Sequence, residues 1–97
     1  MYILNVLGVL LKIVNVSKNI ASIYSYAFEK CGLKNLFIPT SVTVIGTRAF
    51  YRCDDLIIYC EIDSQPEGWN LNWNYYRPVY WAGKWKYDAN GNSVPLS

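Results

Sequence analysis

The chain has 97 residues, of which 53% are hydrophobic and 16% are charged. This length fits a single domain, and this composition excludes an intrinsically disordered chain. A formal net charge of +2 at pH 7, without a cluster of Lys or Arg, argues against a nucleic-acid-binding protein.

An apolar segment opens the chain, from residue 1 to residue 11. The first basic residue is Lys12, which follows this segment, whereas a signal peptide carries its basic residues ahead of the apolar run. The segment is also shorter than a membrane-spanning helix. We therefore expect neither a signal peptide nor membrane insertion.

Polar residues in and after this segment have the spacing of an amphipathic helix. They are Asn5, Gly8, Lys12 and Asn15. We predict a helical turn or short helix over residues 2–9, followed by a strand over 11–16. Residues 1–10 are interpreted as an N-terminal cap or a degenerate repeat. Because the chain begins within a repeat, we interpret it as a remnant or fragment of a longer array.

Residues 11–60 contain a sequence repeat with a period of 22. Five positions of the first copy are Ile20, Ile23, Ala27, Phe28 and Cys31, and their equivalents in the second copy are Val42, Ile45, Ala49, Phe50 and Cys53. A period in the twenties is the length of a leucine-rich repeat. We therefore predict stacked repeats over this region.

Each repeat is predicted to contain a strand and then a helical turn. Leu36 and Ile38 alternate around Phe37, as in a strand with one buried face. Pro39 has no N–H to donate and ends the strand. Thr47 is expected to cap a helical turn, since its hydroxyl can bond to the first N–H groups. The inward face of that turn is expected to carry Ala49, Phe50 and Cys53.

The run Ile-Pro-x-Ser-Val-x-x-Ile-Gly-x-x-Ala-Phe-x-x-Cys over residues 38–53 is similar to the BspA-type leucine-rich repeat of bacterial and some protist surface proteins. The resemblance covers roughly residues 11–60, although Tyr24 and the segment 17–19 depart from the pattern. It implies a leucine-rich repeat β-solenoid, with short stacked strands and helical turns. It also implies a cell-surface or secreted protein that binds host proteins, matrix proteins or other surface proteins.

Residues 61–97 lose the repeat and are interpreted as an aromatic C-terminal cap. Within them we predict a short helical turn and loop over 69–76 and a strand over 79–81. The dipeptide Asn90-Gly91 is a strong signal for a hairpin turn between residues 84–87 and 93–96.

The late aromatic residues allow two interpretations. Bulky rings can cover the apolar end of a repeat array, and exposed Trp and Tyr can bind sugar rings or a partner protein. We assign Trp69, Trp73 and Trp81 to the cap. The assignment of Tyr75, Tyr76 and Trp85 stays open, and these three are the candidate binding residues.

The sequence does not favour catalysis or metal binding. It contains no His, the usual base for nucleophilic catalysis, and no Cys-x-x-Cys pair. Asp88-x-Asn90-x-Asn92 resembles the start of a calcium loop, but the later Gly and Glu are missing, so we predict a hairpin turn. We expect no enzyme activity and no cofactor.

The three cysteines receive separate predictions. Cys31 and Cys53 occupy equivalent repeat positions, and we expect them to be buried and reduced, with a disulfide as the alternative. Cys60 lies at the end of the last repeat strand, and we predict that it is the more reactive thiol.

The predicted function is a non-catalytic protein-binding or adhesion module. The alternatives are a structural or self-associating repeat remnant, and carbohydrate binding by the late aromatic residues. We also predict a homodimer through the apolar N-terminal end, with the alternative that residues 2–9 fold back as a cap and the protein stays monomeric. Its contact residues would be Ile3, Leu4, Val6, Leu7, Val9 and Leu10.

Overall fold

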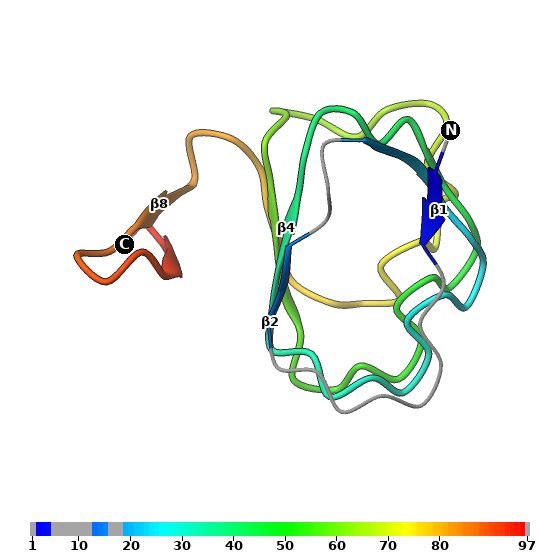
Figure 1. Cartoon of the computed structure of the whole chain (residues 1–97), viewed down its shortest axis with the longest axis horizontal. Helices are drawn as coiled ribbons and strands as arrows, with labels where there is room; N and C mark the ends of the chain where they lie inside the picture. The colour runs from blue at the N-terminus through cyan, green and yellow to red at the C-terminus, as the bar shows by residue number, and fades with distance from the viewer. Residues whose placement is uncertain (1, 5–12, 16–18, 97) are drawn as a thin grey trace.

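The computed structural model describes residues 2–4, 13–15 and 19–96 (Figure 1). Within these ranges the strands form two parallel sheets and one antiparallel hairpin. The first sheet has the order β1-β3-β5, with β1 at Tyr2–Leu4, β3 at Ile20–Ile23 and β5 at Val44–Ile45. The second has the order β2-β4-β6-β7, with β2 at Ile13–Asn15, β4 at Asn35–Ile38, β6 at Ile57–Cys60 and β7 at Val79–Tyr80.

The N-terminal predictions are confirmed only in part. Residues 13–15 form a strand, as predicted. The helix predicted over 2–9 is wrong at residues 2–4, because these pair in parallel with β3. A strand there pairs with the backbone N–H and C=O groups along one edge of β3, which a local helix would leave unpaired. Residues 5–9 lie outside the described part, as do four of the predicted dimer contacts: Val6, Leu7, Val9 and Leu10.

Strands of successive repeats pair at the distance of 22 residues found in the sequence. Val14 is paired with Leu36, and Leu36 is paired with Ile58. In the first sheet β3 and β5 repeat this offset, since Ser22 is paired with Val44, whereas β1 and β3 pair at an offset of 18 to 19 residues. The two sheets lie on opposite sides of the repeat, with β1 facing β2 and β4 across the interior (Figure 1).

The hydrophobic core fills the space between the two sheets. The buried positions of β4 are Leu36 and Ile38, which are 1% and 0% exposed, while Phe37 between them is half-buried. The repeated inward positions behave alike in both copies. The core includes Ile23, Ala27, Phe28, Cys31, Ile45, Ala49, Phe50 and Cys53. The sequence pattern therefore identified the buried face correctly.

Turns, and not helices, follow β3 and β5. The described residues contain no helix, so the predicted helical turns are wrong. Tyr26, Lys30, Arg48 and Arg52 have φ values between 48° and 60°. This left-handed conformation interrupts a right-handed helix. The positions recur at the repeat distance, because Tyr26 is equivalent to Arg48 and Lys30 is equivalent to Arg52.

Backbone hydrogen bonds between repeats replace the bonds of a helix. The N–H of Phe28 donates to the carbonyl of Ala49 at 2.8 Å, and the N–H of Lys30 donates to the carbonyl of Tyr51 at 2.9 Å. Thr47 does not cap a helix, since its hydroxyl donates to the side-chain carbonyl of Asn72. Backbone hydrogen bonds thus join the turns of one repeat to those of the next, just as they join the strands of successive repeats.

Two tryptophans from the C-terminal region complete the core. Trp69 and Trp73 are 2% and 1% exposed, which confirms that they cover apolar surface. The indole N–H of Trp69 donates to the carbonyl of Val42 at 3.1 Å, and that of Trp73 donates to Gln65 Oε1 at 3.0 Å. Trp81 packs against the core and stacks on Trp69, with ring centroids 5.9 Å apart. Buried indole groups thus find the polar partners that burial requires.

The predicted terminal hairpin is confirmed. It consists of β8 at Trp85–Tyr87 and β9 at Ser93–Pro95, which pair antiparallel. The carboxylate of Asp88 accepts hydrogen bonds from the backbone N–H groups of Asn90 at 2.8 Å and Asn92 at 2.9 Å. The Asp88 segment is therefore a turn, as predicted. The hairpin stands outside the second sheet, on the side away from β1 (Figure 1).

Two absences bear on function, both within the described ranges. No helix there is long and apolar enough to cross a membrane. No group of three or more metal-ligating side chains comes together there either.

Candidate functional sites on the aromatic surface

The three candidate binding residues lie in two separate places. Tyr75 and Tyr76 adjoin the turns that follow the first sheet, whereas Trp85 lies in the hairpin on the outer face of the second sheet. The first place we call the tyrosine stripe, which consists of Tyr26, Arg48, Tyr51, Tyr75 and Tyr76. The second we call the hairpin groove, lined by Phe37, Cys60, Glu61, Ala82, Gly83, Trp85, Lys86 and Tyr87.

The tyrosine stripe runs across successive turns. The ring centroids of Tyr26 and Tyr51 are 5.7 Å apart, and those of Tyr51 and Tyr75 are 4.7 Å apart. Tyr76 continues the row at 5.2 Å from Tyr75. Each of these contacts is edge to face, the arrangement that the ring quadrupoles favour. Stacking of the turns therefore brings together residues that are far apart in the sequence.

Arg48 lies among the tyrosine rings of this stripe. Its guanidinium carbon is 5.6 Å from the ring centre of Tyr51 and 5.2 Å from that of Tyr75, within the range of cation–π attraction. A hydrogen bond with the Tyr26 side chain raises the pKa of Arg48 above its usual value. Its partners in these contacts are neutral side chains, so they hold the guanidinium in place without cancelling its charge.

A cavity of about 310 Å³ adjoins the stripe. Its lining consists of Arg48, Leu71, Asn72, Asn74, Tyr75 and Tyr76. Tyr76 and Leu71 are 89% and 94% exposed, whereas Tyr75 is half-buried. The surface therefore combines an apolar side chain, two tyrosines, two amides and a cation within one concave region.

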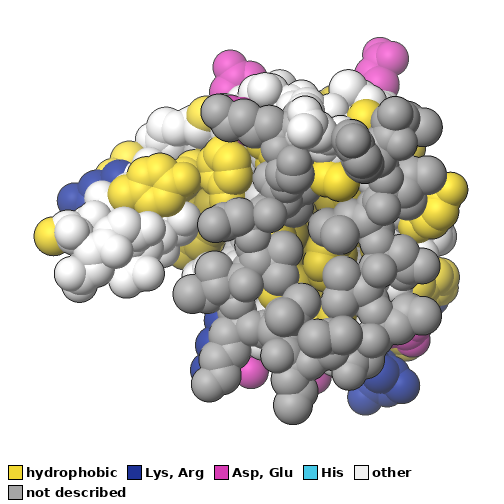
Figure 2. Space-filling view, in the orientation of Figure 1, with side chains coloured by type: hydrophobic (Ala, Val, Ile, Leu, Met, Phe, Trp, Pro, Cys, Tyr) yellow, Lys and Arg dark blue, Asp and Glu magenta, His cyan; other side chains and the backbone are white. Residues whose placement is uncertain are grey.

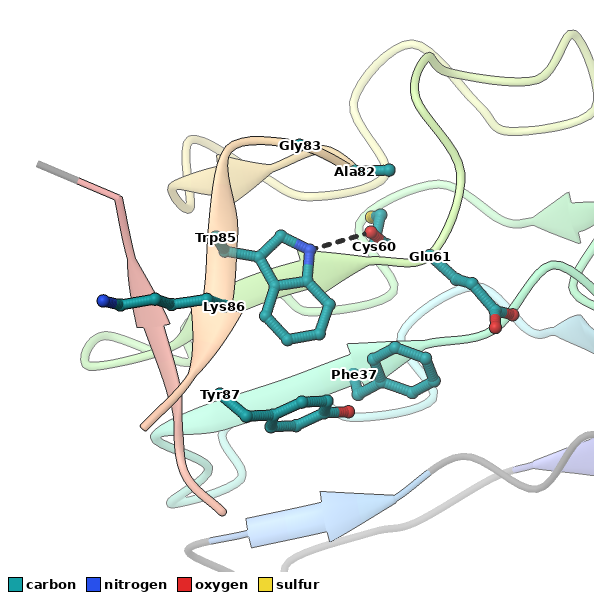
Figure 3. Close-up of a pocket in the computed structure, with 8 residues that line it drawn as sticks. All are labelled: Phe37, Cys60, Glu61, Ala82, Gly83, Trp85, Lys86 and Tyr87. Atoms are coloured by element: carbon teal, nitrogen blue, oxygen red, sulfur yellow. Dashed lines mark hydrogen bonds between the residues drawn. The ribbon is translucent and has the colours of Figure 1, made fainter. Parts of the chain in front are cut away.

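The hairpin groove has a volume of about 360 Å³ (Figure 3). Trp85 is fixed at its centre, because its indole N–H donates to the carbonyl of Cys60 at 3.0 Å. Its ring lies 5.3 Å from that of Tyr59 and 5.8 Å from that of Phe37. Hydrophobic side chains are visible on the projecting hairpin in the space-filling view (Figure 2). The hairpin thus covers part of the outer sheet face and leaves a groove beside it.

The reactivity predicted for Cys60 is wrong. Cys60 follows Ile58 by two positions and is paired with Ile38, so strand alternation turns its side chain towards the core. Cys60 is 0% exposed, and burial raises its pKa to about 12. A thiol with this pKa is inert at neutral pH, because the thiolate is the reactive form.

The predictions for the other two cysteines are confirmed. Cys31 and Cys53 are buried, and no disulfide forms among the three cysteines, all of which are described. The Cys53 thiol donates to the carbonyl of Phe28 at 2.8 Å, and burial raises its pKa to about 11. These side chains act as small core groups between stacked turns.

Sequence reasoning missed several residues of the two sites. Tyr26, Arg48 and Tyr51 were recognisable as side chains flanking the turns, but not as one contact network. Phe37 and Glu61 carry no motif that links them to Trp85. One signal was present: Phe37 and Tyr59 are 22 residues apart on the outer face of adjacent strands. An aromatic pair at equivalent outward positions could have located the hairpin packing.

Residues 8–66 match the family described as BspA type leucine-rich repeat region (6 copies). No curated protein and no solved structure matched the chain. The matched segment makes up more than half of the sequence and contains the strands and turns that pair at the repeat distance. The chain therefore belongs to the BspA-type leucine-rich repeat family.

Proposed function

We propose that the chain is a non-catalytic protein-binding module of a cell-surface or secreted protein, with the tyrosine stripe as its contact surface. The observation that carries this proposal is the network of Tyr26, Tyr51 and Tyr75 around Arg48. Tyr and Arg are the residues that most often dominate the binding energy of protein interfaces. Side chains already held by mutual contacts also lose little conformational entropy when a partner binds.

The family supports the kind of partner. BspA-type repeats are typical of bacterial surface proteins, and leucine-rich repeats generally bind proteins. We infer that the parallel strands form a short β-solenoid, whose turns present the stripe at regular intervals. The proposed partners are host, matrix or other surface proteins. The absence of His from the sequence supports a role without catalysis.

A binding experiment on purified extracellular-matrix glycoproteins tests this proposal. The intact chain would be measured by biolayer interferometry against an immobilised panel, beside Arg48→Ala and Tyr76→Ala. We expect at least one panel member to bind, and each substitution to weaken that binding about tenfold or more, as for a hot-spot residue. Tyr24→Ala is the matched control, since Tyr24 is a tyrosine exposed to 52% outside the stripe. An affinity that is unchanged in both Arg48→Ala and Tyr76→Ala would refute the tyrosine stripe as the contact surface.

Self-association is the second candidate function, and the strand order favours it. β1 and β2 are the first strands of their sheets, so each has one edge without a neighbour among the described strands. Such edges can pair with another chain. We propose a homodimer through this N-terminal end. Light scattering on the intact chain and on a Leu4→Glu, Leu7→Glu variant tests it: the variant should be monomeric, and a monomeric intact chain would refute the dimer.

A further inference from the structure

The hairpin groove has a second set of recognition groups, which are separate from the tyrosine stripe. Residues of β8 alternate in direction: Trp85 and Tyr87 point towards Phe37, whereas Lys86 points away (Figure 3). The Trp85 and Tyr87 rings meet edge to face with centroids 5.0 Å apart, and Phe37 meets Trp85 in the same manner at 5.8 Å. Three rings therefore line one side of the groove, and the π faces of such rings attract cations.

A carboxylate lies at the rim of the same groove. Glu61 follows β6 directly, and its side chain reaches the space beside Phe37 (Figure 3). Its Oε1 accepts a hydrogen bond from the backbone N–H of Thr40 at 2.9 Å, and its own N–H donates to the carbonyl of Ile38 at 3.0 Å. Both partners are neutral backbone groups, so these bonds fix the residue and leave its negative charge available. The rings and the carboxylate therefore both favour a positively charged ligand.

The groove continues along the hairpin. A second cavity of about 110 Å³ shares Phe37 and Tyr87 with the first, so the two adjoin at these rings. The rest of its lining consists of Asn35, Leu36, Gly91, Asn92 and Ser93. The side-chain amides and the hydroxyl can donate and accept hydrogen bonds, as an extended peptide backbone requires. A small cation would fill only one part of such a groove, whereas a peptide can occupy both.

We propose that the hairpin groove binds an extended peptide segment through an arginine side chain. The planar guanidinium stacks on the indole of Trp85 and pairs with the carboxylate of Glu61, and the peptide backbone runs over the second cavity. Arginine fits better than lysine because its guanidinium is flat, weakly hydrated and able to form two parallel bonds to one carboxylate. The partner is therefore a protein with an exposed, extended, arginine-containing segment.

Three peptides that differ at one position test the ligand. Acetylated five-residue peptides of Gly and Ser would carry a central arginine, lysine or citrulline, which is a neutral analogue of arginine. The readout is the indole N–H resonance of Trp85, which is held by Cys60. We expect saturable shifts with the arginine peptide, at least fivefold weaker binding of the lysine peptide, and no binding of the citrulline peptide. Equal binding of arginine and citrulline would overturn the proposal, and equal binding of lysine would overturn the selectivity for arginine.

Substitutions test the position of the site. Glu61→Gln removes the charge but keeps an oxygen that can accept from Thr40, so the fold is preserved while arginine binding should weaken about tenfold. Tyr87→Leu should also weaken binding. Lys84→Gln is the matched control, because Lys84 is exposed and lines neither cavity of the groove, and it should leave the affinity unchanged. The Trp69 indole resonance reports whether each variant remains folded.

The two sites can be distinguished directly. Arg48→Ala and Tyr76→Ala should leave the arginine-peptide shifts of Trp85 intact, whatever their effect on the matrix-protein panel. Loss of the Trp85 shifts in these stripe variants would overturn the groove as the binding site. A neutral oligosaccharide that shifts Trp85 equally in the intact chain and in Glu61→Gln would overturn it as well, and would assign a sugar platform.

Discussion

Phe28 and Phe50 stack with ring centroids 5.2 Å apart and ring planes only 15° from parallel. The two residues are 22 positions apart, so the stack joins equivalent sites of successive repeats. Trp73 extends the column, since its ring meets Phe50 edge to face at 6.0 Å. A single column of aromatic rings thus connects both repeats to the C-terminal region.

Phe50→Ala should lower the free energy of unfolding by about 3–5 kcal/mol, because it removes the middle ring of this column and leaves a cavity. Phe50 is 0% exposed. Urea unfolding followed by tryptophan fluorescence measures the change. Tyr24→Ala serves as the control and should change stability by less than about 0.5 kcal/mol. A small effect of Phe50→Ala would show that the column does not support the core.

Gly46→Ala should destabilise the chain by about 1–3 kcal/mol through overpacking. A Cβ at this position would collide with the backbone nitrogen of Ser25 in the preceding repeat. The close approach of two turns therefore requires glycine at this position. Gly46 N–H also donates to the carbonyl of Ile23 at 2.9 Å, which fixes the spacing of the repeats.

Thermal unfolding of two alanine variants separates packing from backbone strain. A Cβ at Gly83 would meet no atom within 4 Å, although its φ of +87° disfavours any L side chain. Gly83→Ala thus measures strain alone, about 1–2 kcal/mol. Adding Ser25→Ala to Gly46→Ala should not restore stability, because it removes the Ser25 hydroxyl but leaves the collisions with the Ser25 backbone nitrogen and Cα. Full recovery in the double variant would contradict this explanation.

The repeat distance explains what the sequence could predict about the fold. Buried residues such as Phe28 and Phe50 recur at a fixed offset, and the strands then pair at that same offset. The turns were less predictable, because Tyr26 and Arg48 adopt a left-handed backbone conformation that Gly or Asn would have signalled. Hydrogen bonds to the next repeat stabilise this conformation, and no local sequence pattern reports such bonds.

The candidate sites were less predictable than the fold. Trp85 reaches Phe37 and the Cys60 carbonyl only because the hairpin folds back onto the second sheet. That placement depends on tertiary packing and leaves no periodic signal. The burial of Cys60 was available in principle, since Cys60 is 22 residues after the buried strand residue Ile38. Comparing Cys60 with its equivalent Ile38 in the preceding repeat would have corrected that prediction.

The native thiols should react slowly with a disulfide reagent at pH 8. Burial raises the pKa of Cys53 to about 11 and that of Cys60 to about 12, so little thiolate is present. The folded pKa values exceed the ordinary value of 9.0, so the folded state favours the protonated thiols. The stability that comes from burying these protonated thiols is complete below about pH 9 and is lost as the pH rises through 11 to 12.

Absorbance on reaction with an aromatic disulfide checks this expectation. Native protein should show almost no immediate reaction, and all three thiols should react once urea is added. Ser64→Cys provides a positive control, because Ser64 is exposed in a loop and a thiol there should react at once. Rapid reaction of Cys60 in the native chain would contradict its inward orientation.

The hairpin turn should weaken in acid before the core does. Backbone N–H groups of Asn92 and Asn90 donate to the Asp88 carboxylate and lower the pKa of Asp88 below its ordinary value. The charged form is therefore favoured in the folded hairpin. Its contribution is present above the ordinary pKa of 3.8 and is lost as the pH falls through the lower, folded-state pKa.

We expect the Trp85 indole resonance to change in that range, while the Trp69 resonance, held by Val42 in the core, stays constant. The titration is best made in Glu61→Gln, since Glu61 adjoins Trp85 in the groove. Asp88→Asn should remove the pH dependence of the Trp85 resonance, because the amide keeps an acceptor oxygen but does not titrate. A Trp85 titration that survives Asp88→Asn would show that another group controls the hairpin.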